Sequence, residues 1–126
     1  ALIKDKDVFI NGDGETSRDF CYIENAIQIN LLAATTENSD ATDQVYNVAV
    51  GSSTTLNELY KTIKEILNMH ITPNTMHKAS YRDFRVGDVR YSKADITKAQ
   101  NLLYYHKTHN IRQGLEKTIK WYINNN

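Results

Sequence analysis

Short strand-like runs alternate with helical segments along this chain of 126 residues. The runs Val8-Phe9-Ile10 and VYNVAV (45–50) are short and apolar, which is typical of buried strands. In four other segments apolar residues recur every three or four positions, which predicts helices at about residues 24–36, 55–67, 92–103 and 110–123. Strands that alternate with helices indicate an α/β fold, here with short strands and about four helices.

Two of the predicted helices have sequence signals at their starts. Thr55 and Glu58 have the spacing of a capping box, in which each side chain binds a backbone N–H of the first helical turn. Ser92 stands three residues before Asp95 and suits two roles, the N-cap of the next helix or a hydrogen bond to a ligand. Between these helices, the chain from about residue 75 to 91 is expected to be extended or irregular.

The stretch GDGETSRDFCY (12–22) contains two glycines that could cradle a phosphate or form a turn. It lacks the Lys-Ser/Thr of a P-loop and the third glycine of a dinucleotide fingerprint, and Asp13 would repel a phosphate. We therefore predict a turn in which the glycines adopt positive φ. The turn would join the strand at 8–10 to a second one at 18–23, as a hairpin or a looped strand pair, with Phe20 and Tyr22 on one face.

Arg18 opens this second predicted strand, beside aromatic residues that should be packed. An arginine at the start of a buried strand is costly unless its charge meets an anionic ligand or a carboxylate. The structural alternative to ligand binding is an ion pair with Asp19, Asp83 or Glu24. The pattern alone supports both interpretations equally.

A second group of arginines lies in the segment YRDFRVGDVRYS (81–92), which contains Arg82, Arg85 and Arg90 with Asp83 and Asp88. Guanidinium groups suit phosphate because their planar forks bind two oxygens at once. Asp88 could accept a hydrogen bond from a sugar hydroxyl. The alternative is a solvated loop whose charges neutralise one another, which the charge pattern alone favours.

Composition excludes several functional classes. Fifteen basic residues balance fifteen acidic ones, so no net field attracts nucleic acid or an anionic membrane, and we expect neither as a partner. The single cysteine, Cys21, rules out an internal disulfide framework and cysteine-rich zinc sites. No apolar run approaches the ~20 residues that span a bilayer, and the charged start ALIKDKD is unlike a signal peptide. These features favour a cytoplasmic location.

No metal site or catalytic constellation is expected from the remaining polar residues. His106 and His109 are three apart in a polar turn with no nearby carboxylate, so we interpret both as surface residues rather than metal ligands. Cys21 has no neighbouring histidine and is interpreted as a core residue. No Ser/His/Asp pattern or pair of catalytic carboxylates stands out.

Three segments of the chain resemble a known family: NGDGETSRDFCYIENAIQINLLAATT, QVYNVAVGSSTTLNEL and YRDFRVGDVRYSKADITKA. They are similar to the C-terminal half of extended short-chain dehydrogenase/reductases that act on nucleotide sugars. The match through GDGETSRDFCYIEN most resembles the bacterial UDP-N-acetylglucosamine 4-epimerases of surface-polysaccharide biosynthesis. The resemblance implies that residues 1–126 are the C-terminal, nucleotide-sugar-binding portion of a Rossmann-type enzyme, without its N-terminal NAD-binding domain. The start ALIK lacks an initiator Met and reads like the last turn of a helix, so we expect the chain to begin inside a larger protein.

The resemblance also implies roles for five residues. Arg18, in the RDF motif, would face the nucleotide diphosphate, and Arg85 would contact the pyrophosphate. Asp88 would bind a ribose hydroxyl, Ser92 would add a contact on the uridine side, and Phe9 would line the uracil pocket. The expected partner is a UDP-sugar, and the full-length relative is expected to be a homodimer.

The chain departs from the family in what it lacks. It has no Gly-rich fingerprint, and the pair Tyr60 and Lys64 fits Tyr-x-x-x-Lys only as a bare pattern, in a helix where the family has no catalytic residues. The resemblance thus implies that NAD and the catalytic residues belong to the N-terminal domain. We expect the isolated chain to be inactive and to hold no cofactor. Relatives pack the VYN strand and neighbouring helices onto the cofactor domain, so the chain alone is expected to expose apolar surface and to self-associate.

Two alternatives to a UDP-N-acetylglucosamine/N-acetylgalactosamine 4-epimerase stay open. The first is a non-catalytic domain that binds a nucleotide or a protein partner. The second keeps the family and changes the reaction to that of a dehydratase or a uronate epimerase.

Overall fold

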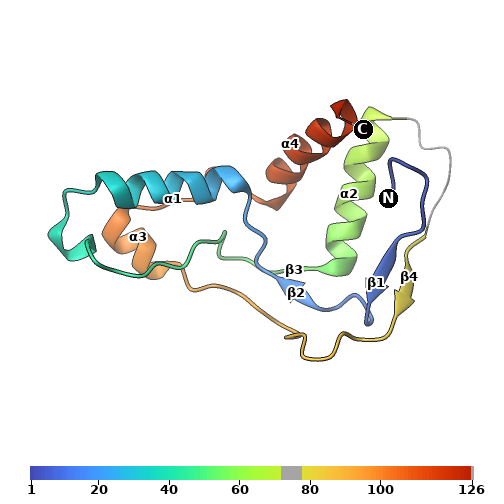
Figure 1. Cartoon of the computed structure of the whole chain (residues 1–126), viewed down its shortest axis with the longest axis horizontal. Helices are drawn as coiled ribbons and strands as arrows, with labels where there is room; N and C mark the ends of the chain where they lie inside the picture. The colour runs from blue at the N-terminus through green and yellow to red at the C-terminus, as the bar shows by residue number, and fades with distance from the viewer. Residues whose placement is uncertain (72–77, 126) are drawn as a thin grey trace. The chain divides into compact units, whose positions relative to one another are not determined.

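The structure is a computed structural model that describes residues 1–71 and 78–125, and every structural statement below refers to these residues. Part of the segment expected to be irregular, residues 75–77, lies outside them. The order of elements is β1 (Phe9–Asn11), β2 (Ser17–Arg18), α1 (Ile23–Thr35), a 3-10 turn η1 (Ser39–Ala41), β3 (Thr54–Thr55), α2 (Leu56–His70), β4 (Ser80–Arg82), α3 (Thr97–Leu103) and α4 (Ile111–Asn124) (Figure 1). The predicted α/β class, with four helices and short strands, is confirmed for the described residues.

The chain divides into two compact units. The first unit consists of Ala1–Arg18, Thr54–Ser92 and Leu115–Asn126, and the second of Asp19–Ser53 and Lys93–Gly114. Both units are therefore built from segments that are distant in sequence. All five residues to which the family resemblance gives binding roles belong to the first unit.

In the first unit the strands form two short pairs. β1 pairs with β4 in parallel, with Phe9 opposite Ser80 and Asn11 opposite Arg82, and the two strands lie side by side in Figure 1. β2 pairs with β3 in antiparallel fashion, with Ser17 opposite Thr55.

The predicted pairing of the strand at 8–10 with that at 18–23 is therefore wrong. The backbone after the glycine turn binds the start of α2 instead, because the N–H of Leu56 donates to the carbonyl of Thr16 at 3.0 Å. The N–H of Asn57 donates to the carbonyl of Gly14, also at 3.0 Å. These bonds direct β2 to β3 rather than to β1.

The core of the first unit lies between α2 and the C-terminal part of α4. Its buried side chains are Ile66, Leu67 and Ile119, and partly buried apolar residues pack around them: Leu2, Ile3, Ile63, Ile71, Leu115 and Ile123. The predicted capping box of α2 is confirmed, since the Thr55 hydroxyl accepts from the N–H of Glu58 at 3.1 Å. The Glu58 carboxylate in turn accepts from the N–H of Thr55 at 2.8 Å.

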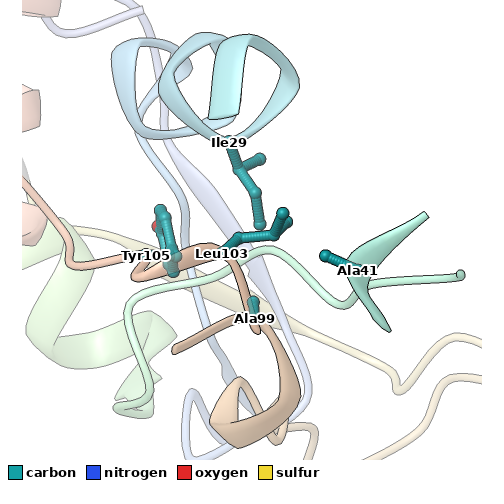
Figure 2. Close-up of a cluster of buried hydrophobic side chains, with 5 residues drawn as sticks. All are labelled: Ile29, Ala41, Ala99, Leu103 and Tyr105. Carbon is teal, nitrogen blue, oxygen red and sulfur yellow. The ribbon is translucent and has the colours of Figure 1, made fainter. Parts of the chain in front are cut away.

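The second unit has its own core, formed by α1, η1, α3 and the loop after α3. The buried side chains are Ile29, Ala41, Ala99, Leu103 and Tyr105, which converge in Figure 2. The Tyr105 hydroxyl donates to the carbonyl of Ala49 at 2.9 Å. Burial is the main reason why the pKa of Tyr105 is raised to about 12, so this hydroxyl keeps its proton at neutral pH.

The predicted strand at 45–50 is wrong, because the segment has no strand partner among the described residues. Val45 is 86% exposed, and only Ala49 and Val50 are buried. Side chains take over the hydrogen bonds that a strand ladder would supply. The Asp19 carboxylate accepts from the backbone N–H groups of Val50 and Gly51, each at 3.0 Å.

The third helix starts later than predicted, at Thr97 rather than Ser92. The Asp95 carboxylate accepts from the N–H of Thr97 at 2.9 Å, and hydrogen bonding to Thr97 lowers the pKa of Asp95. Ser92 is therefore no N-cap. It lies five residues before the helix, where its N–H donates to the carbonyl of Ser17 at 3.2 Å.

Helix α1 is confirmed, but it exposes most of its predicted apolar face. Ile23, Ile27 and Leu31 stand four residues apart and are 60%, 51% and 61% exposed. The buried side chains of the helix are Asn25 and Ile29. This stripe is apolar surface of the kind expected for the isolated chain. None of the described helices is both long and apolar enough to cross a membrane.

Asn25 connects α1 to the segment before α4. Its side chain is fully buried, its amide donates to the carbonyl of His109 at 2.8 Å, and its oxygen accepts from the N–H groups of Thr108 and His109 at 2.9 and 3.1 Å. No other side chain supplies these bonds in the described part of the chain.

We predict that Asn25→Ala lowers the free energy of unfolding by about 1–3 kcal/mol, because the part-buried backbone groups of Thr108 and His109 lose their partners. Urea unfolding followed by circular dichroism measures the change. Asn30→Ala is the matched control, since Asn30 is exposed on the same helix and bonds only to the carbonyl of Ala26 one turn earlier. Equal stability of the Asn25 variant and the wild type would contradict the role given to Asn25.

Candidate functional site

The candidate site is built around the backbone of Ser17, which binds two segments that are distant in sequence. On one side Ser17 pairs with Thr55 of β3. On the other side its N–H donates to the carbonyl of Arg90 at 2.9 Å, and its carbonyl accepts from the N–H of Ser92. Ser17 is 6% exposed, so these bonds are shielded from water. They fix the arginine-rich segment 82–92 beside the strand that carries Arg18.

Arg18 and Asp88 form an ion pair between Nη2 and Oδ1. The other terminal nitrogen of Arg18, Nη1, donates to the carbonyl of Ser17 at 2.7 Å. The sequence alternatives named Asp19, Asp83 or Glu24 as ion-pair partners, and the structure places Arg18 on Asp88 instead. Asp19 is engaged with backbone N–H groups of its own unit, as described above. The two residues with implied diphosphate and ribose roles are thus in direct contact.

A second ion pair connects Arg90 to Asp13 in the glycine turn, with 2.5 Å between Nη2 and Oδ2. The hydrogen bond from Arg90 is the largest cause of the lowered pKa of Asp13, followed by a bond from the N–H of Glu15. Asp13 is therefore a structural anion that holds the turn to the segment 82–92. It leaves no role for the turn as a phosphate cradle.

The prediction of positive φ in this turn is confirmed, with +78° at Gly12 and +80° at Gly14. A Cβ on Gly12 would overlap the ring of Phe84, and a Cβ on Gly14 would overlap the side chain of Asn57. Each of these positions thus requires glycine for two reasons: its backbone has a positive φ, and a neighbouring side chain comes so close that no Cβ fits.

Arg85 lies against β1. With the Asn11 amide oxygen turned toward it, the orientation that satisfies both groups, Nε and Nη2 of Arg85 lie 2.9 and 3.3 Å from that oxygen. Arg85 also begins a tight turn, since the N–H of Asp88 donates to its carbonyl at 3.2 Å and Gly87 has a φ of +78°. A positive φ at the third position of such a turn favours glycine. The turn sets the spacing between Arg85 and Asp88.

Phe9 lies on the same face of β1 as Asn11, because alternate residues of a strand share a face. Ile10 between them is buried, whereas Phe9 is 45% exposed. The guanidinium carbon of Arg82 lies 3.3 Å from the centroid of the Phe9 ring, which is cation–π geometry. An exposed aromatic ring and two arginines therefore line one face of the β1–β4 pair.

The four arginines of the first unit differ in their partners. Arg18 and Arg90 are paired with carboxylates. Among the described residues, Arg82 and Arg85 contact a ring and a neutral amide instead. Since no carboxylate of the described residues pairs with these two guanidiniums, both could bind an anion.

The structure brings together some of the residues with predicted roles. Arg18 and Asp88 are in contact, and the backbone of Ser92 bonds to Ser17, next to Arg18. Arg85 and Phe9 lie along β1. Sequence reasoning missed Asn11, although its place two residues after Phe9 already puts it on the same strand face.

The other candidate residues have structural explanations. Lys64 lies 5.7 Å from the centroid of the Tyr60 ring, and burial raises the pKa of Tyr60, which is opposite to what a catalytic base requires. Cys21 is half-buried, and burial raises its pKa. Contrary to the expectation of no nearby carboxylate, Glu24 lies 3.5 Å from His109. No group of three His, Cys, Asp or Glu residues close enough to hold a metal ion occurs in the described part of the chain.

Comparison with known proteins identifies the family. The model of the GDP-mannose 4,6 dehydratase family matches residues 1–118. The chain belongs to this family of extended short-chain dehydrogenase/reductases, which act on nucleotide sugars as epimerases and dehydratases. It is 31% identical over 123 residues to the dTDP-glucose 4,6-dehydratase of Haemophilus influenzae, covering 92% of this chain and 35% of that protein.

Solved structures of other proteins share the fold. The UDP-glucose 4-epimerase of Thermotoga maritima, solved with UDP-glucose, has 31% identity and a TM-score of 0.85 over 98% of this chain and 37% of its own. The UDP-N-acetylglucosamine 4-epimerase of Methanobrevibacter ruminantium, solved with UDP-N-acetylmuramic acid, has 31% identity and a TM-score of 0.85 over 100% and 37%. MoeE5, solved with UDP-glucuronic acid and NAD, has 28% identity and a TM-score of 0.82 over 98% and 39%. The chain thus spans between a third and two fifths of the length of these relatives.

We predict that Asp13→Asn lowers the stability of the chain at pH 7 and that the loss disappears in acid. Because the pKa of Asp13 is lowered on folding, its pair with Arg90 stabilises the folded chain above the ordinary carboxyl pKa of about 3.9. This contribution is lost as the pH falls through the lower folded value. Urea unfolding of both proteins at several pH values between 7 and about 3 measures the effect.

Asp7→Asn is the matched control, because Asp7 is exposed and precedes β1. A stability difference between wild type and Asp13→Asn that stays constant across this pH range would show that the pair contributes nothing electrostatic.

Proposed function

We propose that the first unit binds the UDP part of a nucleotide sugar, as the C-terminal portion of an NAD-dependent UDP-N-acetylglucosamine/N-acetylgalactosamine 4-epimerase of polysaccharide biosynthesis. The observation that carries the proposal is the contact between Arg18 and Asp88, with Arg85 one tight turn away. Family membership and UDP-sugars in the solved relatives support it. We place the whole protein in the cytoplasm and expect it to act as a homodimer.

In this proposal the arginines bind the diphosphate. Arg85 already lacks a carboxylate partner among the described residues, and the fork of Arg18 keeps donors beyond those used by Asp88 and Ser17. Asp88 keeps a second carboxylate oxygen for a ribose hydroxyl. Phe9 would line the uracil pocket, and Ser92 would add a contact on the uridine side.

Binding of this kind contributes to catalysis from a distance. Energy gained at the nucleotide can position the sugar for a reaction elsewhere, because the non-reacting part of a substrate fixes the register of the reacting part. In the proposal no catalytic residue lies in this chain, and the reaction takes place on the preceding domain.

The described residues do not fit NAD. A dinucleotide site needs a Gly-rich turn between a strand and a helix, whose N-terminal N–H groups bind the pyrophosphate. The only long helix that directly follows a strand in the described part, α2, has Thr54 and Thr55 before it, and its first N–H groups bind Thr55 and Thr16. We therefore propose that NAD binds to the N-terminal domain of the full-length enzyme.

We predict that Arg18→Ala and Arg85→Ala each weaken UDP binding by about 1.5–3 kcal/mol, the worth of hydrogen bonds to a charged group. This is roughly 10- to 150-fold in Kd. Titration calorimetry with UDP, on the full-length protein that carries this chain, measures it. Arg112→Ala is the matched control, since Arg112 lies on α4 in the second unit. Unchanged UDP affinity in both site variants would refute the assignment.

We predict that the pure 126-residue chain does not interconvert UDP-N-acetylglucosamine and UDP-N-acetylgalactosamine, with or without added NAD. Chromatography of the sugar nucleotides after prolonged incubation measures this. Turnover by the chain alone would place catalytic residues within it. The same assay on the full-length protein, with UDP-glucuronate and dTDP-glucose as further substrates, decides between epimerase, uronate epimerase and dehydratase chemistry.

A further inference from the structure

We propose that Arg82 reads the nucleobase and selects uracil over cytosine. The inference rests on the proposed function, because it concerns the base of the same nucleotide. It adds a specificity residue to which the family resemblance gave no role and which the sequence pattern offered only as one of several arginines suited to phosphate.

Arg82 is held in place but not neutralised. Its guanidinium carbon lies 3.3 Å from the centroid of the Phe9 ring. Within the described residues, no carboxylate or carbonyl accepts a hydrogen bond from its guanidinium, although Arg18 and Arg90 both have such acceptors. A guanidinium has five N–H donors and no acceptor. Arg82 therefore presents a plane of donors that no carboxylate or carbonyl of the described residues uses.

This plane lies at the right place for a base. Arg82 is the parallel partner of Asn11, so both side chains share a face of the β1–β4 pair with Phe9. The amide oxygen of Asn11 accepts from Arg85, which, like Arg82, has no carboxylate partner in the described part of the chain. Alternate residues along a strand are about 7 Å apart. A nucleotide with its phosphates on Arg85 would thus bring the edge of its base to the donors of Arg82, where the guanidinium lies on the Phe9 ring.

The chemistry of the plane favours some bases. The N–H donors of a guanidinium point outward within its plane, so they reach the edge of a base that lies beside Arg82. Uracil and cytosine have nearly the same shape but differ at position 4, where uracil has a carbonyl oxygen and cytosine an amino group. A group that only donates hydrogen bonds can bind the carbonyl but not the amino group. Arg82 therefore discriminates between the two pyrimidines.

The test compares three ligands, UDP, CDP and inorganic pyrophosphate, by titration calorimetry on the full-length protein and on Arg82→Gln. Glutamine keeps a planar end but carries both a donor and an acceptor, so it does not distinguish the two bases. We expect the wild type to bind UDP about tenfold more tightly than CDP, the ratio that one hydrogen bond to a charged group supplies. In Arg82→Gln the ratio falls to within about twofold, whereas pyrophosphate affinity changes little.

Two further variants complete the design. Phe9→Leu removes the ring that holds the guanidinium and is expected to lower the UDP to CDP ratio as well. Arg112→Gln is the matched control and keeps the wild-type ratio. Circular dichroism and urea unfolding of each variant verify that the fold is retained.

Each contrary outcome has one meaning. A wild-type ratio near one, or an unchanged ratio in Arg82→Gln, overturns the role of Arg82 while UDP binding, and with it the proposed function, stands. Equal loss of UDP, CDP and pyrophosphate affinity in Arg82→Gln makes Arg82 a phosphate contact, which also overturns the inference. Failure of the wild type to bind UDP overturns both the proposed function and this inference.

Discussion

The candidate site depends on the backbone of Ser17. β2 is only two residues long, yet its buried backbone pairs with β3 on one side and binds the backbone of residues 90–92 on the other. The bonds of Ser17 reach 38 positions along the sequence to β3 and more than 70 positions to residues 90–92. Without them, the strand that carries Arg18 and the loop that carries Asp88 would not be held next to each other. The ion pairs of Arg18 and Arg90 are long-range for the same reason. A buried backbone thus positions side chains that are themselves close to water.

The charge balance of the site explains how it can bind an anion without a basic surface. Segments 9–18 and 80–92 contain four arginines and four acidic residues: Arg18, Arg82, Arg85, Arg90, Asp13, Glu15, Asp83 and Asp88. Geometry makes the cations unequal. Arg90 holds the glycine turn through its ion pair with Asp13, and Arg18 is paired with Asp88. Arg85 contacts the neutral amide of Asn11, and Arg82 contacts the ring of Phe9. Neither of these two arginines is paired with a carboxylate of the described residues. Affinity for a diphosphate would then come from the placement of a few planar donors rather than from a net field.

Local signals predicted the local structure well. The capping box at Thr55 and Glu58 and the positive φ of Gly12 and Gly14 follow from interactions within a few residues, and the structure confirms them. The errors arise where distant groups replace a local partner. Asp19 binds the N–H groups of Val50 and Gly51, so the segment 45–50 stays out of a sheet, and Asp95 rather than Ser92 binds the first N–H of α3. The pairing of Arg18 with Asp88 could not be chosen from sequence, because several carboxylates were available and only the fold decides which one is near.

Five arginines make the central claim directly measurable, since each gives a separate side-chain Nε–H signal in a nitrogen-15 NMR spectrum. Adding UDP to the labelled chain should shift the signals of Arg18 and Arg85 with a common dissociation constant and leave that of Arg112 in place. If the signals of Arg18 and Arg85 do not move, or move no more than that of Arg112, the first unit does not hold the nucleotide.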